Sequence, residues 1–214
     1  MASLLFDIGA NRGLYLDANR NKYTQSILVE ANPSLCSFLE KKYIGDTSVQ
    51  IVNCIVSNKT SETFYISNAD TISTVDRDWI ENSRFAGSYQ WQPIENIPAV
   101  SIDALITKYG VPSFIKIDVE GYEYNVLLSM TKAYCPLSFE WAEEKKDELL
   151  LSLKYLQELG YSRFTIQQED KYDYLIDEND WLTYEDIYVM LNTLCEPTRK
   201  KYWGMVWASK EKSL

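Results

Sequence analysis

Short apolar runs alternate with amphipathic segments along most of this 214-residue chain, and this alternation is the feature that most restricts its fold. Residues 4–8, 26–30 and 113–118 are mostly apolar, as expected of strands that are buried on both faces of a parallel sheet. Residues 33–39 and 143–159 instead place apolar side chains on one face of a helix. Strands that alternate with helices predict a three-layer α/β sandwich with a mostly parallel, seven-stranded sheet.

The alternation is lost in two segments. Residues 68–98 are polar and aromatic without a clear period, and residues 169–202 are acidic and aromatic. Both are predicted to be excursions on the substrate side of the sheet. The strands at 163–167 and 205–208 are predicted to pair as neighbours without a crossover helix, which leaves the last strand antiparallel. Since no linker or repeat divides the chain, residues 1–214 are predicted to form a single domain. Further strands are predicted at residues 49–56, 62–67, 99–101 and 137–140.

Composition excludes several classes of partner. The net charge is −10, and no basic run is longer than residues 199–201. Because an acidic surface repels phosphate backbones, no nucleic-acid partner is expected. No apolar run approaches the roughly 20 residues that span a bilayer, and the first residues lack a signal-peptide pattern. The four cysteines are scattered without a C-x-x-C pair, which favours buried free thiols and a reducing, cytoplasmic location.

The chain contains no histidine. This absence removes the commonest general base and the commonest transition-metal ligand. A Ser-His-Asp triad, a histidine-bound zinc site and a histidine phosphotransfer centre are all excluded. Acid–base chemistry must therefore come from carboxylates, lysine, tyrosine or bound water.

A glycine-containing turn follows the first predicted strand. The sequence from Asp7 to Gly13 reads D-I-G-A-N-R-G and precedes a helical segment. Glycine allows a tight turn and the close approach of a ligand, where a Cβ would clash. Glu30 ends the second strand about 20 residues later, where it is placed to accept hydrogen bonds from a ribose diol. A turn, a helix and a strand-terminal carboxylate in this order predict a nucleoside site.

The turn differs from the one that binds dinucleotides. The G-x-G-x-x-G pattern requires glycine at two positions where this chain has Asn11 and Leu14. Asp7, directly before the turn, places negative charge where a dinucleotide would bring its pyrophosphate. S-adenosylmethionine carries a sulfonium and an ammonium and no phosphate, so an acidic site favours it. A nicotinamide-dependent oxidoreductase of the short-chain type would also need a Tyr-x-x-x-Lys pair, and none of the 16 tyrosines has lysine four residues later.

Three blocks of this sequence together resemble the FkbM family of methyltransferases: residues 7–13, residues 30–33 (E-A-N-P) and residues 115–123 (I-K-I-D-V-E-G-Y-E). The resemblance extends from residue 4 to about residue 141. It implies the class I methyltransferase fold, S-adenosylmethionine as cofactor, and O-methylation, often of sugar or polyketide hydroxyls. The residues expected to contact the cofactor are Asp7, Gly9, Ala10, Asn11, Gly13, Glu30, Ala31, Asn53, Cys54 and Asp118.

Acidic residues gather where two later strands end. Asp118, Glu120 and Glu123 lie at or just beyond one strand, and Glu140 ends the next. Because ligands bind at the carboxyl ends of strands in such sheets, Asp118, Glu120 and Glu140 are the candidate catalytic residues. They could supply a general base, or Asp118 and Glu140 could hold a divalent cation such as magnesium or manganese. Stabilisation of a helix N-terminus is a third role, which suits Glu123. Lys116 is interpreted as structural, either extending toward solvent or pairing with a carboxylate.

The acceptor is expected to be a carbohydrate or another hydroxyl-bearing molecule. Flat aromatic side chains beside carboxylates suit a polyhydroxyl ligand, although they equally suit a loop that packs on a core. A non-catalytic methyltransferase fold that serves as a binding module is the alternative from another class. Because the first strand begins at residue 4, the domain is also expected to belong to a longer polypeptide, with glycosyltransferase domains as possible neighbours. The aromatic residues concerned are Trp79, Phe85, Tyr89, Trp91, Trp181, Tyr184 and Tyr188.

Overall fold

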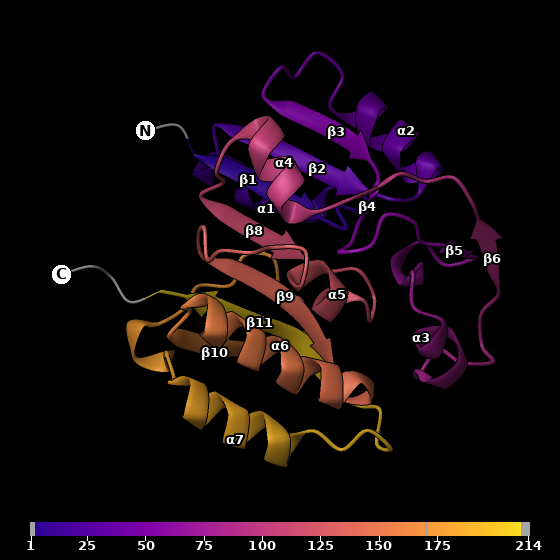
Figure 1. Ribbon diagram of the computed structural model, residues 1–214. Coiled ribbons are helices and arrows are strands. Elements are labelled where there is room, and N and C mark those ends of the chain that lie inside the picture. The colour runs from indigo at the N-terminus through magenta and orange to yellow at the C-terminus, as the bar shows by residue number, and fades with distance from the viewer. Residues whose placement is uncertain (1–2, 170, 211–214) are drawn as a thin grey trace.

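The computed structural model describes residues 3–169 and 171–210 and has a seven-stranded sheet at its centre (Figure 1). The strand order is β10-β11-β9-β8-β1-β2-β3, and β11 alone runs in the direction opposite to that of the other six strands. The predicted α/β fold with a mostly parallel sheet is therefore confirmed. The remaining positions of the predicted domain, residues 1–2, 170 and 211–214, lie outside the described residues. The sheet strands are β1 (Leu4–Ile8), β2 (Gln25–Glu30), β3 (Val49–Asn53), β8 (Phe114–Ile117), β9 (Leu137–Ala142), β10 (Arg163–Gln168) and β11 (Trp203–Ser209).

Helices cover both faces of the sheet and complete the three layers. On one face, α4, α5, α6 and α7 bury apolar side chains against the larger core cluster. On the other face, α1 and α2 pack over a second cluster that includes Leu16 and Leu39. The helices are α1 (Leu14–Asn19), α2 (Pro33–Lys42), α3 (Arg77–Asn82), α4 (Ile102–Tyr109), α5 (Glu123–Leu127), α6 (Lys146–Leu159) and α7 (Tyr184–Leu194). Short 3₁₀ turns occur at Arg20–Lys22 (η1), Asp70–Ile72 (η2), Glu143–Lys145 (η3) and Glu178–Asp180 (η4).

Strand alternation decides which side chains meet inside the sheet. In β1, Phe6 and Ile8 face the larger cluster, while Leu5 faces the smaller one. Successive side chains of a strand point to opposite faces, so Asp7 shares the face of Leu5. Asp7 is paired in register with Lys116 on the adjacent strand β8. The sheet therefore places a carboxylate and an ammonium next to each other inside an apolar layer.

The third predicted strand is shorter than expected. It was predicted over residues 49–56, but β3 ends at Asn53, and β4 (Ile55–Val56) leaves the sheet to pair with β7 (Ala99–Val100). The Asn53 side chain donates to the backbone carbonyl oxygens of Glu30, at 2.9 Å, and Ala31, at 3.0 Å, which fixes the chain where it turns away. Apolar character alone does not reveal this change of partner.

The second excursion contains a helix that the sequence interpretation missed. Strands β10 and β11 pair as predicted, but α7 lies between them in the sequence and packs against α6. Thr183 caps α7 by accepting the Asp186 N–H, and Ile187 and Leu191 are buried one turn apart. The two strands are therefore antiparallel neighbours without a crossover, as predicted, but the helix in their connection was not predicted, because acidic and aromatic residues hid its amphipathic pattern.

The first excursion lies beyond the carboxyl ends of the central strands (Figure 1) and spans residues 57–98, which is longer than the predicted 68–98. It contains η2, α3 and an antiparallel pair formed by β5 (Phe64–Ser67) and β6 (Trp91–Ile94). The strand at β5 was predicted, whereas α3 and β6 were not. This segment forms the side of the molecule that faces the ends of β1, β2, β8 and β9.

The remaining general expectations concern cysteines and membranes. All four cysteines are buried and free, as the sequence predicted. Within residues 3–169 and 171–210, no helix has both the length and the apolar character needed to cross a bilayer.

Candidate functional site

A cavity of about 670 Å³ opens at the carboxyl ends of the central strands. Its walls come from the turn after β1, the ends of β2, β8 and β9, and the excursion over residues 57–98. This edge of an open α/β sheet is where such folds bind ligands. The cavity therefore lies where the sequence predicted a site.

The turn after β1 forms the floor of one end of this cavity. Gly9 and Ala10 both donate backbone N–H groups to the carbonyl oxygen of Val29, at 2.9 and 3.0 Å. Gly9 has a φ of 76°, and a Cβ at this position would lie 1.7 Å from the backbone oxygen of Asp118. Only glycine fits between the ends of β1 and β8. The turn is thus held against both neighbouring strands while its upper surface faces the cavity.

Glu30 projects from the end of β2 into the same part of the cavity and is almost fully buried. Its two carboxylate oxygens accept the backbone N–H groups of Asn11 and Asn32, each at 2.8 Å. Burial raises the pKa of Glu30, and these two hydrogen bonds oppose the rise. Two backbone donors fix the orientation of the carboxylate, and the remaining lone pairs are left for a ligand.

Asp7 and Lys116 form a buried ion pair beneath the turn. The Lys116 Nζ lies 3.5 Å from Asp7 and 3.0 Å from Asp118, and it donates to the Gly9 carbonyl oxygen at 3.2 Å. Burial raises the pKa of Asp7, whose side chain is fully buried. Lys116 therefore connects the turn after β1 to the carboxylate that ends β8, and its interpretation as a residue paired with carboxylates is correct.

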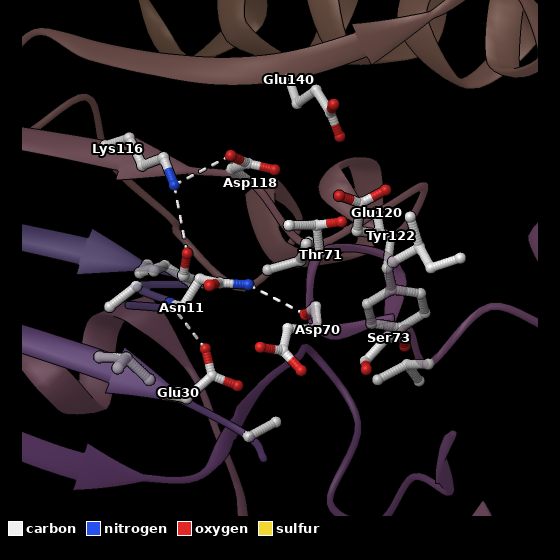
Figure 2. Close-up of a pocket in the computed structure, with 18 of the residues that line it drawn as sticks. Asn11, Glu30, Asp70, Thr71, Ser73, Lys116, Asp118, Glu120, Tyr122 and Glu140 are labelled. Carbon is white, nitrogen blue, oxygen red and sulfur yellow. Dashed lines mark hydrogen bonds and ion pairs between the residues drawn. The ribbon is translucent and has the colours of Figure 1, made fainter. Parts of the chain in front are cut away.

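Three carboxylates converge on the opposite side of the cavity (Figure 2). One carboxylate oxygen each from Asp118, Glu120 and Glu140 lies within 4.8 Å of the other two. Asp118 and Glu120 follow β8, and Glu140 belongs to β9. The structure thus brings together the three residues that the sequence singled out as catalytic candidates.

Glu120 has the most perturbed environment in this cluster. Burial raises its pKa well above the ordinary value, and the charges of Asp118 and Glu123 add to the rise. Its backbone has a φ of 58°, a left-handed conformation that is uncommon outside glycine. Its carbonyl oxygen accepts a hydrogen bond from the Thr74 hydroxyl at 2.7 Å. A carboxyl whose pKa is raised above its ordinary value is a candidate for proton transfer.

The residue after Glu120 allows the excursion to approach closely. A Cβ on Gly121 would lie 3.0 to 3.1 Å from three ring atoms of Trp79. The indole of Trp79 is therefore packed against bare backbone and forms part of the cavity wall. Glu123, by contrast, accepts the Val119 N–H at 2.9 Å and does not line the described cavity.

A short segment of the excursion, residues 70–75, covers the cavity as a roof. The Asn11 side chain donates to the Asp70 carbonyl oxygen at 2.9 Å, and Arg12 pairs with the Asp70 carboxylate. At its other end the roof is tied to the backbone of Glu120 through Thr74. Both attachments join the excursion to elements that also line the cavity.

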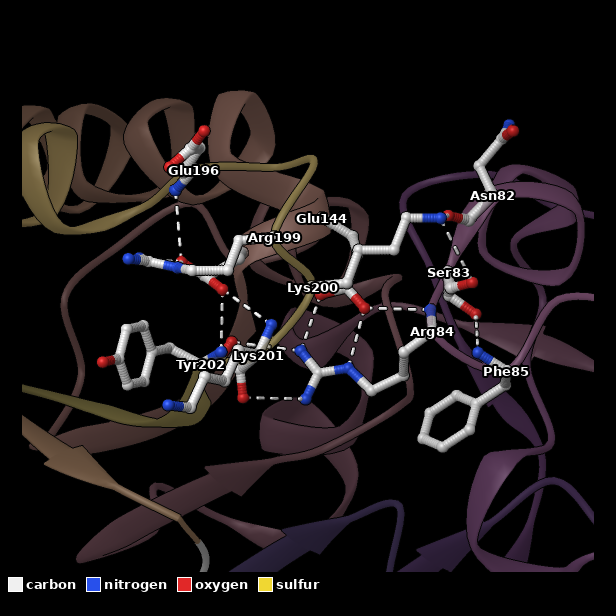
Figure 3. Close-up of polar contacts among 11 residues, drawn as sticks. Asn82, Ser83, Arg84, Phe85, Glu144, Glu196, Arg199, Lys200, Lys201 and Tyr202 are labelled. Atoms are coloured by element: carbon white, nitrogen blue, oxygen red, sulfur yellow. Dashed lines mark hydrogen bonds and ion pairs between the residues drawn. The ribbon is translucent and has the colours of Figure 1, made fainter.

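Two adjacent carboxylates fix the far wall of the cavity (Figure 3). The Arg84 guanidinium donates to both carboxylate oxygens of Glu144, at 2.7 and 2.6 Å, and to the Tyr202 carbonyl oxygen at 3.0 Å. Glu143, fully buried, accepts the backbone N–H groups of Lys201 and Tyr202 at 2.7 and 2.8 Å. The excursion, the end of β9 and the segment before β11 are thereby joined at one point.

The Glu143 contacts predict an acid-sensitive contribution to stability. Burial alone would raise the pKa of this carboxyl, but Arg199 and three backbone donors lower it to about 2. Since the folded-state pKa lies below the ordinary value, the stabilisation is present above about pH 4.5 and is lost as pH falls toward 2. Glu143→Gln should reduce the free energy of unfolding at pH 7 by about 2 kcal/mol. Urea unfolding measured between pH 7 and pH 3 should show that the free energies of unfolding of wild type and variant become more similar as the pH falls. A difference in free energy that stays constant over this range would contradict this role.

The structure divides the predicted cofactor residues into two groups. Seven of them line the cavity: Gly9, Ala10, Asn11, Glu30, Ala31, Cys54 and Asp118. Asp7, Gly13 and Asn53 are not among the described lining residues, and their contact with a cofactor stays a prediction. Strand alternation directs the Asp7 side chain below the glycine turn, toward Lys116. The Gly13 carbonyl oxygen accepts a hydrogen bond from the Tyr43 hydroxyl. The Asn53 side-chain amide donates to the backbone of β2.

Several residues of the site could not be assigned from the sequence. Arg84 lies in the aperiodic excursion and received no role, although it lines the cavity. Lys116 could have been suspected because it interrupts the apolar run of β8. The second excursion contributes Tyr172 to the described lining, whereas Trp181 stacks with Arg163 at 5.0 Å and α7 packs on α6.

Comparison with known protein families decides the relationship of the chain. The Methyltransferase FkbM domain matches residues 7–163. The chain belongs to the FkbM methyltransferase family. The matched part of this FkbM methyltransferase contains the glycine turn, Glu30, the three clustered carboxylates and Arg84, and it extends beyond the limit near residue 141 that the sequence resemblance suggested. A search of curated proteins found no match.

Several solved structures are similar to this chain at low sequence identity. A precorrin-6y C5,15-methyltransferase from Geobacter metallireducens GS-15 is 12% identical, with a TM-score of 0.48 over 98% of this chain and 81% of that one. The Methanococcus jannaschii fibrillarin pre-rRNA processing protein is 10% identical, with a TM-score of 0.47 over 99% and 68%. M. capricolum TrmK, in complex with S-adenosyl-homocysteine, is 8% identical, with a TM-score of 0.44 over 99% and 63%.

Proposed function

We propose that this FkbM methyltransferase transfers a methyl group from S-adenosylmethionine to a hydroxyl, on a sugar of a glycan. The observation that carries the proposal is the arrangement of two opposed walls around one cavity. The glycine turn and Glu30 form one wall, and Asp118, Glu120 and Glu140 form the other. A nucleoside site and a proton acceptor thus face the same space.

The residues present fit the chemistry of S-adenosylmethionine. The Glu30 carboxylate, oriented by two backbone N–H groups, would accept hydrogen bonds from the ribose hydroxyls. Cys54 and Ile55 supply apolar surface to the same cavity where the chain leaves β3, and this surface would suit the adenine. An acidic cavity also favours a sulfonium and an ammonium over a pyrophosphate. When bound, this cofactor supplies an electrophilic methyl group and leaves as S-adenosylhomocysteine.

The carboxylate cluster would handle the proton of the acceptor hydroxyl. A neutral hydroxyl is a weak nucleophile and must lose its proton as the new C–O bond forms. Glu120 is the best-suited base because burial and neighbouring charge raise its pKa well above the ordinary value of a carboxyl. Asp118 is held 3.0 Å from the Lys116 ammonium, so we assign it mainly to orienting the reacting groups. Glu140 reaches the cluster from β9 and completes it.

The acceptor side of the cavity supports a sugar ligand. Trp79 and Phe85 pack edge to face, with ring centroids 5.8 Å apart, and both line the cavity with Trp203. Aromatic faces stack on the C–H surface of a pyranose, while carboxylates accept its hydroxyl protons. The O-methylation of sugar hydroxyls implied by the family resemblance agrees with this surface.

Two measurements test the proposal. Isothermal titration with S-adenosylhomocysteine should show binding at one site per chain. An assay with methyl-labelled S-adenosylmethionine against a panel of glycans should then transfer label to a saccharide hydroxyl. Failure to bind the nucleoside would overturn the proposal, and binding without transfer to any glycan would favour a non-catalytic binding module.

The metal hypothesis for Asp118 and Glu140 leads to a separate prediction. The cluster has the all-oxygen donor set that magnesium or manganese would use. The Lys116 ammonium, however, already supplies positive charge 3.0 Å from Asp118. We therefore expect methyl transfer to persist after EDTA treatment. A loss of activity that magnesium or manganese restores would instead assign a divalent cation to these carboxylates.

The roof over the cavity predicts how fast the product nucleoside leaves. Asp70→Asn removes the charge that pairs with Arg12. Since an exposed ion pair contributes roughly 0.2–1 kcal/mol, release should accelerate about two- to fivefold. Stopped-flow tryptophan fluorescence after displacement of S-adenosylhomocysteine would measure the rate, with exposed Asp147→Asn as the control. An unchanged rate would show that the ion pair does not restrain the roof.

A further inference from the structure

Acidic groups outnumber basic groups around the cavity. Eight charged side chains contribute to its described lining, five of them carboxylates and three of them cations. The carboxylates concentrate at the acceptor end, where Asp118, Glu120 and Glu140 meet. The carboxylates are Glu30, Asp70, Asp118, Glu120 and Glu140, and the cations are Arg12, Arg84 and Lys116.

Each of the three lining cations is engaged with acceptors of the protein itself. Arg12 pairs with Asp70 on the roof. Lys116 contacts Asp7, Asp118 and the Gly9 carbonyl oxygen.

Arg84 is the cation on the wall opposite the cofactor turn, and four of its five N–H donors are used within the protein. Its Nε and one terminal nitrogen hold the Glu144 carboxylate, and that terminal nitrogen also donates to the Tyr202 carbonyl oxygen. The other terminal nitrogen donates to the Lys201 carbonyl oxygen at 3.5 Å. This guanidinium is a structural joint between three segments (Figure 3). It would have to break that joint to bind a phosphate, sulfate or carboxylate on an acceptor through both terminal nitrogens.

These charges determine what an acceptor is able to carry near its reactive group. An anion next to Glu120 and Glu140 would meet like charges at close range in a partly buried site, where screening is weak. Each cation among the described lining residues already pairs with a carboxylate of the protein. We infer that the acceptor bears no negative charge near the methylated position, so that neutral or amino sugars are used and uronates, sulfated sugars and phosphosugars are rejected. The inference rests on the proposed function and adds a charge rule to it.

The rule is testable without knowing the sugar. Three stable analogues of S-adenosylmethionine would carry nitrogen in place of sulfur, with the transferable methyl replaced by a 3-hydroxypropyl, 3-aminopropyl or 2-carboxyethyl arm. The arm projects toward the acceptor end, so its terminal group reports the charge preference there. By isothermal titration, the carboxylate arm should bind at least about tenfold more weakly than the hydroxyl arm. The ammonium arm should bind as tightly as the hydroxyl arm or more tightly.

A pair of variants separates local charge from overall charge. Glu140→Gln should reduce the difference between the carboxylate and hydroxyl arms severalfold, because it removes one of the clustered charges. Glu158→Gln changes the net charge equally on the exposed surface of α6 and should leave the difference intact. If the carboxylate arm binds as tightly as the hydroxyl arm, the charge rule is wrong. If S-adenosylhomocysteine itself fails to bind, the proposed function fails instead.

Discussion

Glu30→Ala should reduce the affinity for S-adenosylhomocysteine by about 100-fold or more. Hydrogen bonds to a charged group contribute about 1.5–3 kcal/mol each, and two ribose hydroxyls would lose their acceptor. The backbone N–H groups of Asn11 and Asn32 would also lose their partner, so the turn would no longer be held in place. Isothermal titration on the purified chain measures the effect directly.

The control for this experiment lies on the next helix. Glu40 is exposed on α2, and Glu40→Ala makes the same change in net charge without touching the cavity. Its affinity should match that of wild type. Glu30→Gln keeps an acceptor oxygen, so its affinity for S-adenosylhomocysteine should lie between those of Glu30→Ala and Glu40→Ala. Wild-type affinity in Glu30→Ala would mean that the nucleoside does not bind at the end of β2.

Glu120→Gln should lower kcat by about 10²–10⁴-fold, the range expected when a general base is removed. The affinity for S-adenosylhomocysteine should change little, because Glu30 and the turn are untouched. Burial raises the pKa of Glu120, and the base acts in its ionised form. The wild-type rate should therefore rise with pH through the raised pKa, and this acid limb should disappear in the variant.

Asp118→Asn provides the comparison within the same cluster. It removes a carboxylate that contacts Lys116 but leaves Glu120 able to accept a proton. Its turnover should fall, while the acid limb of the pH profile should remain. If the rate of Asp118→Asn no longer falls at acid pH while that of Glu120→Gln still does, the general base is Asp118 and not Glu120. Thermal unfolding of both variants would show whether either change acts through the fold.

Local pattern was sufficient for the parts of the fold that are built from neighbouring residues. The strand–turn–helix around Gly9 and the placement of Glu30 depend on residues close together in sequence, and both were predicted correctly. The cluster of Asp118, Glu120 and Glu140 was also predictable, since parallel strands end at one edge of the sheet. These features follow from the alternation of strands and helices along the chain and from the shared direction of the parallel strands.

The parts that the sequence did not reveal depend on contacts between distant residues. Residues 55–56 are as apolar as a sheet strand, yet they pair with residues 99–100 outside the sheet. Arg84 acquires its place from Glu144, which lies 60 positions away. The Asp7 side chain is withdrawn from the cavity because register places it beside Lys116. No window of sequence contains both members of such a pair.

The excursion over residues 57–98 departs after β4 and returns at β7, and these two short strands lie side by side. One contiguous stretch therefore contains both the roof and the aromatic residues Trp79 and Phe85 of the cavity wall. Its two ends are adjacent, where β4 pairs with β7. Such an arrangement lets evolution, or an engineer, exchange the stretch between family members as a cassette. A chimera made this way should acquire the donor's choice of acceptor while it keeps its own nucleoside chemistry, provided that the partner of Arg84 is transferred with it.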